Sequence, residues 1–111
     1  MILDQDGNIS IITQEKATII ELVKKINDIY YKLKNDNIIV NLTSLSKLRL
    51  GEVSEFLELS NRHRDANHSF VIVSDGISTD DDTPDEIIVV PTMQEAYDII
   101  EMEEIERDLG F

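Results

Sequence analysis

The sequence contains no cysteine, only two prolines and only four glycines in its 111 residues. Without cysteine, a disulfide scaffold, a thiolate zinc site and a cysteine nucleophile are excluded. The same absence is typical of a reducing compartment, so we expect a cytoplasmic protein. None of the four glycines belongs to a phosphate-binding loop, a dinucleotide-binding fingerprint or a Gly-x-Ser-x-Gly nucleophile elbow.

Long apolar runs, a signal peptide and aromatic residues are also scarce or absent. No run approaches the ~18 apolar residues of a membrane span, and the segment from Met1 to Asp6 lacks the basic and apolar regions of a signal peptide. Aromatic residues make up 5% of the chain, and the net charge of −13 repels phosphate groups. We therefore expect neither a membrane nor a nucleic acid as a direct partner.

Basic residues are nearly absent from the last third of the chain. Residues 1–74 contain ten acidic and nine basic residues, whereas residues 75–111 contain thirteen acidic residues and only Arg107. The ordinary interpretation is a solvated loop and a solvated helix face, and the alternative is an electrostatic surface for a partner. The hydrophobic content of 41% and the length indicate one folded domain over residues 1–111.

The first half of the chain predicts a hairpin, a helix and a buried strand. The apolar runs Met1–Leu3 and Ile9–Ile12 flank an Asp-Gly-Asn turn. A helix is predicted over about Gln14–Lys34, because one apolar stripe recurs there at steps of three and four residues. The β-branched run Ile38–Leu42 indicates a strand that is covered on both faces.

The second half predicts a helix over about Leu48–Arg64, a strand over Ser69–Ser74, an acidic loop over residues 75–85 and a strand over Ile87–Val90. A long C-terminal helix follows over residues 92–109, and Thr92 and Glu95 have the spacing of a capping box at its start. The alternation of strands and helices indicates an α/β fold with a mixed sheet of four to five strands and three main helices.

Few residues indicate catalysis or metal binding. His63 and His68 are the only histidines, and their place near the end of a helix favours helix-end charges over metal ligands. The acidic residues Asp80–Asp82, Asp85 and Glu86 lack neighbours that would fix a cation geometry. We expect no enzyme activity, no cofactor and no metal.

The segment Asn41-Leu42-Thr43-x-Leu45, which ends a strand before a helix, resembles the Asp-Leu-Ser-x-Val motif of STAS domains. The length and the order of elements are also similar to this family, which includes bacterial anti-sigma factor antagonists. The resemblance implies a STAS-like fold and a non-catalytic, regulatory role in protein–protein interaction. The family's phosphorylatable serine would fall at Leu50 or Gly51, so the resemblance is to a member without the usual phosphoserine.

The resemblance also implies a partner surface around the start of the second helix. In this chain that surface would comprise Ser44, Ser46, Lys47, Arg49, Gly51 and Glu52. Either Ser44 or Ser46 would suit phosphorylation or helix capping equally well. The basic residues of the surface predict that it docks an acidic segment, either of a partner or of the C-terminal helix of another copy.

A second candidate surface is the end of the C-terminal helix, where Met102, Ile105, Leu109 and Phe111 continue the apolar character. These residues would form a homodimer seam, or they would fold back onto the sheet of the same chain. Two other functions stay open: a sensor that binds a small ligand or nucleotide, and an accessory protein of an RNA-processing enzyme such as ribonuclease Z. The chain itself lacks the His-x-His-x-Asp-His metal motif of ribonuclease Z.

Overall fold

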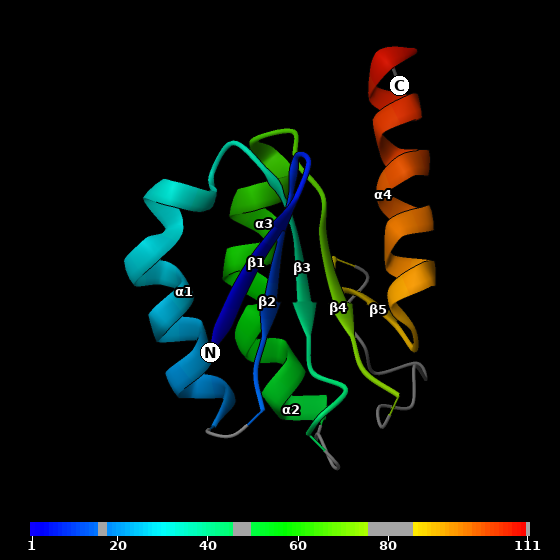
Figure 1. Ribbon diagram of the computed structural model, residues 1–111. Coiled ribbons are helices and arrows are strands. Elements are labelled where there is room, and N and C mark those ends of the chain that lie inside the picture. The colour runs from blue at the N-terminus through cyan, green and yellow to red at the C-terminus, as the bar shows by residue number, and fades with distance from the viewer. Residues whose placement is uncertain (16–17, 46–49, 76–85, 111) are drawn as a thin grey trace.

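Five strands form one mixed sheet in the order β1-β2-β3-β4-β5 (Figure 1), in a computed structural model that describes residues 1–15, 18–45, 50–75 and 86–110. The first pair of strands is antiparallel, and the other three pairs are parallel. This arrangement confirms the predicted α/β fold with a mixed sheet. The strands are β1 (Ile2–Asp6), β2 (Ile9–Thr13), β3 (Asn37–Asn41), β4 (Phe70–Val73) and β5 (Ile88–Val90).

Helices cover the sheet on both faces (Figure 1). On one face lie α1 (Ile19–Leu33), α2 (Leu50–Val53), the 3-10 turn η1 (Ser54–Phe56) and α3 (Leu57–Asp65). On the other face lies α4 (Met93–Asp108), which is the single helix there among the described residues. Because β3 and β4 are covered on both faces, Ile38–Val40 and Phe70–Val73 are completely buried, as their β-branched sequences predict.

The predicted hairpin forms, and its turn depends on Gly7. Gly7 has φ +58°, a left-handed conformation that glycine adopts without a steric penalty. Every residue of β1 is exposed, so the hairpin places an open edge strand beside β2.

The first helix begins at Ile19, later than the predicted Gln14. Gln14 extends β2 instead, and its backbone N–H donates to the Asn41 carbonyl at 3.2 Å. Thr18 then caps the helix, since its hydroxyl accepts from the Glu21 N–H at 3.2 Å.

The segment predicted as one helix over about Leu48–Arg64 forms three consecutive helical pieces from Leu50 onward, which are α2, η1 and α3. The 3-10 turn η1 separates α2 from α3 and places the fully buried Phe56 against Phe70, with ring centroids 6.2 Å apart. The predicted residues 48–49 lie outside the described residues.

The start of α4 shows half of the predicted capping box, because the Glu95 carboxylate meets the Thr92 hydroxyl and not the Thr92 backbone N–H. The Thr92 hydroxyl accepts from the Glu95 N–H at 3.2 Å and donates to the Glu95 carboxylate at 3.1 Å. The inner side of α4 buries Ala96 and Ile100 against β3 and β4. In Figure 1 the last turns of α4 continue past the end of the sheet where the β1–β2 turn lies.

Candidate functional site

The predicted partner surface at the start of the second helix is described only in part. Ser46, Lys47 and Arg49 lie outside the described residues. Ser44 is exposed in the turn after β3, Gly51 lies in α2, and Glu52 is half-buried in the same helix.

Asn41 shapes the start of the loop that follows β3. The Asn41 side-chain oxygen accepts from the Thr43 N–H at 3.1 Å and from the Thr43 hydroxyl at 2.8 Å. This is an Asx turn, in which the Thr43 hydroxyl donates to the Asn41 side chain.

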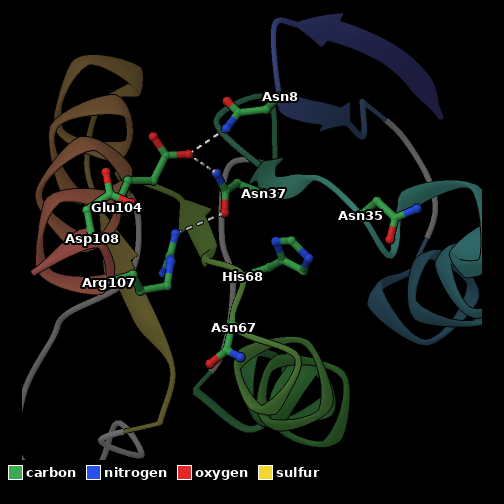
Figure 2. Close-up of a pocket in the computed structure, with 8 residues that line it drawn as sticks. All are labelled: Asn8, Asn35, Asn37, Asn67, His68, Glu104, Arg107 and Asp108. Carbon is green, nitrogen blue, oxygen red and sulfur yellow. Dashed lines mark hydrogen bonds between the residues drawn. The ribbon is translucent and has the colours of Figure 1, made fainter. Parts of the chain in front are cut away.

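A polar network lies at the opposite edge of the sheet, where β2, β3 and β4 begin; we call this the amino edge. At its centre is Asn37, which is buried (2% exposed) on the face that α4 covers. Its amide nitrogen donates to Glu104 Oε1 at 2.6 Å, and Asn8 donates to the same oxygen at 2.6 Å. Figure 2 shows these two asparagines converging on Glu104.

The other side of Asn37 completes the network. Its side-chain oxygen accepts from the Ser69 backbone N–H at 2.8 Å and from Arg107 Nη2 at 3.4 Å (Figure 2). Arg107 Nη1 also donates to the Ser69 hydroxyl at 3.2 Å. Arg107, the only basic residue after position 74, is therefore engaged at the amino edge and does not neutralise the outer surface of α4.

The network borders an open polar hollow of about 360 Å³. Figure 2 shows the side chains around it, which are Asn8, Asn35, Asn37, Asn67, His68, Glu104, Arg107 and Asp108. In open α/β sheets ligands usually bind at the carboxyl ends of the strands, and this hollow lies at the amino ends. The best-supported role of the network that borders the hollow is to hold the end of α4 against the sheet.

An ion pair adds a second attachment for α4. Arg64 Nη1 lies 2.9 Å from Glu103 Oε2, with 24% and 15% of the two side chains exposed. Arg64 Nη2 also donates to the Phe70 carbonyl at 2.9 Å. The pair connects the end of α3, the start of β4 and the second half of α4.

His63 is fully buried, with both ring nitrogens hydrogen-bonded. Nε2 lies 2.7 Å from the Asp36 carbonyl, which only accepts, so we assign the proton to Nε2. Nδ1 then accepts from the Tyr30 hydroxyl at 2.7 Å. Burial lowers the pKa of His63 to about 4, despite the opposing effect of the hydrogen bond to Asp36.

The prediction of a helix-end charge is therefore wrong for His63. The imidazole lies in the last turn of α3 but is neutral at pH 7, because desolvation outweighs the attraction of the helix terminus. The ring stacks on His68 at 5.3 Å and is enclosed by Tyr30 and Phe70. A substrate cannot reach either nitrogen, so His63 has a structural role.

The outward side of α4 carries three exposed apolar side chains. Met102, Ile105 and Leu109 are 50%, 53% and 67% exposed, and we call them the outer row. They point away from the sheet and do not fold back onto it. Phe111, the fourth residue of the predicted seam, lies outside the described residues.

Carboxylates border this outer row. Asp98, Glu101 and Glu106 line a shallow hollow of about 270 Å³ together with Met102 and Ile105. All three acidic side chains are exposed. The outer face of α4 thus combines a narrow apolar stripe with negative charge on its borders.

No protein-family model and no curated protein matches this chain. Within the described ranges, no group of three or more His, Asp or Glu side chains is arranged to hold a metal ion. No helix in that same part of the chain is both long and apolar enough to cross a bilayer.

The sequence interpretation missed the network at the amino edge. Its members are far apart in the sequence, since Asn37 and Glu104 are separated by 67 positions. Two signals were present: an asparagine directly before the β-branched run Ile38–Val40, and a single arginine within an acidic helix. Neither signal shows which residue the asparagine or the arginine contacts, because these residues meet only when α4 packs on the sheet.

Proposed function

We propose that this protein is a non-catalytic, regulatory protein-interaction module whose contact face is the outer row of α4 with its acidic border. The observation that carries the proposal is the exposure of Met102, Ile105 and Leu109 in one stripe. These side chains lie on a helix whose other sides are fixed by the core and by the amino-edge network. A rigid helix with an exposed apolar stripe is a common form of protein-docking surface.

The resemblance to STAS domains supports the same class of function, and it places the module in the bacterial cytoplasm. The hairpin followed by parallel strands and the two helical layers are compatible with that resemblance. The surface that begins at Ser44 would be a second contact region. An RNA-processing enzyme such as ribonuclease Z is one candidate partner.

Affinity purification from the source cells tests the proposal. Tagged wild-type protein is compared with the double variant Met102→Ser/Ile105→Ser and with the control Ile20→Ser, which changes an apolar side chain on α1 that is 68% exposed. We expect one protein to co-purify with the wild type and the control at equal yield and to be depleted at least tenfold with the double variant. Equal recovery with all three proteins would overturn the proposed contact face.

A small-ligand sensor is the second candidate function, and the polar hollow at the amino edge is the observation that favours it. His68 is half-buried there, beside the exposed amides of Asn35 and Asn67. A thermal-shift screen with polar metabolites tests this function. A ligand of the hollow raises the Tm of the wild type but not that of Asn67→Ala, since binding to the folded state alone stabilises it.

A further inference from the structure

The outer row has the length and spacing of a short helix-docking stripe. Met102, Ile105 and Leu109 are separated by three and four residues, which keeps them on one side of α4. The stripe runs for about 10 Å along the helix, at 1.5 Å per residue. An α-helix of two to three turns has a matching length when its own apolar side chains recur at the same steps.

The charge beside the stripe identifies the chemistry of its partner. Asp98, Glu101 and Glu106 flank the row, and within the described residues no Lys or Arg forms an ion pair with any of them. Of the seven acidic residues in α4, Glu103 pairs with Arg64 and Glu104 accepts from asparagines, so both are used internally. Among the described residues, the carboxylates that face outward beside the row thus have no cationic partner, and Asp98 accepts a hydrogen bond from Gln94 at 3.0 Å.

We infer that the outer row binds a partner's basic amphipathic helix, in which an apolar stripe is bordered by Lys or Arg. The inference rests on the proposed function and specifies its partner. Lysines or arginines on the two borders would meet Glu101 and Glu106, while the partner's leucines would cover Met102 and Ile105. A second copy of this chain fits poorly, because its own α4 would bring a second set of acidic residues against the first.

Fluorescence anisotropy with a designed peptide tests the inference. The probe is a labelled 18-residue helix with leucines at heptad positions a and d and lysines on the borders. The controls are a scrambled peptide of the same composition and a peptide with glutamate in place of every lysine. We expect the amphipathic lysine peptide to bind at least tenfold more tightly than either control.

Matched variants locate the binding. Met102→Ser/Ile105→Ser should weaken the binding of the lysine peptide at least tenfold, and Ile20→Ser should leave it unchanged. The double variant Glu101→Gln/Glu106→Gln should weaken the binding of the lysine peptide severalfold and make that binding less dependent on salt. The control Asp28→Asn/Glu58→Gln changes two exposed acidic residues on α1 and α3, and it should leave both the affinity and the salt dependence unchanged.

Four results would overturn the inference. The first is equal binding of the scrambled peptide, which would mean charge attraction only. The second is binding that the outer-row variant does not change. The third is a doubled molar mass of the wild type in light scattering, if Met102→Ser/Ile105→Ser restores the mass of a monomer. That result would mean that the face serves self-association. Fourth, if the lysine peptide fails but a cellular partner is still lost with the outer-row variant, the inference is wrong and the proposed function stands.

Discussion

At His63, burial sets the protonation state, and this has a consequence for stability. The folded-state pKa of about 4 lies below the value of about 6.5 for an exposed histidine. Between these two values the unfolded chain binds a proton that the folded protein does not. The contribution of a neutral His63 to stability is therefore complete above about pH 6.5 and is lost as the pH falls toward 4.

We expect this loss to reach about 3 kcal/mol in the free energy of unfolding. Urea denaturation of the wild type and of His63→Asn at pH 7, 5.5 and 4 measures it. The variant should be less stable at pH 7, because it leaves the Tyr30 hydroxyl and the Asp36 carbonyl without the imidazole. The difference between the two proteins should shrink as the pH falls. A constant difference across the three pH values would contradict the assignment of a neutral His63.

At the scale of elements, α4 depends on two kinds of attachment. Its first half is held by apolar packing of Ala96 and Ile100, and its second half by polar contacts at the amino edge. Glu104→Ala should cost about 1–3 kcal/mol, because it leaves the buried Asn37 amide without its acceptor. Glu106→Ala, on the exposed side of the same helix, should change stability by less than about 0.5 kcal/mol.

Hydrogen exchange measures the same attachment locally. In Glu104→Ala the backbone amides of the second half of α4 should exchange faster, while those near Ile100 keep their protection. Uniform loss of protection along the whole helix would show instead that α4 is held as a single unit. In that case the division into apolar and polar attachments is wrong.

The elements with strong local signals were predictable from the sequence. The helix cap at Thr92, the turn at Gly7 and the buried strands β3 and β4 all follow from short patterns. The first helix was predicted too long, since Gln14 pairs with β3 through a contact that no local pattern reveals. Likewise, His63 is buried because α1, α3 and β4 pack around it. Its polar residue type suggested a charged side chain at a helix end, and no local pattern indicates the burial.

At the scale of the whole molecule, the charge of −13 is divided between a nearly neutral body and an acidic last third. The structure refines this division, because Glu103, Glu104 and Arg107 lie on the attached sides of α4. The carboxylates that remain outward border the outer row. The same helix therefore contributes to the fold on one side and presents apolar and acidic groups on the other.

Site-specific photo-cross-linking in the source cells tests the central claim, that the outer face of α4 is a protein-interaction surface. A photoreactive residue is placed at Ile105 in one protein and at Ile20 in another, since both positions are more than half exposed. We predict one discrete adduct with a partner protein from position 105 and none from position 20. No adduct from position 105, or the same adducts from both positions, would contradict the account.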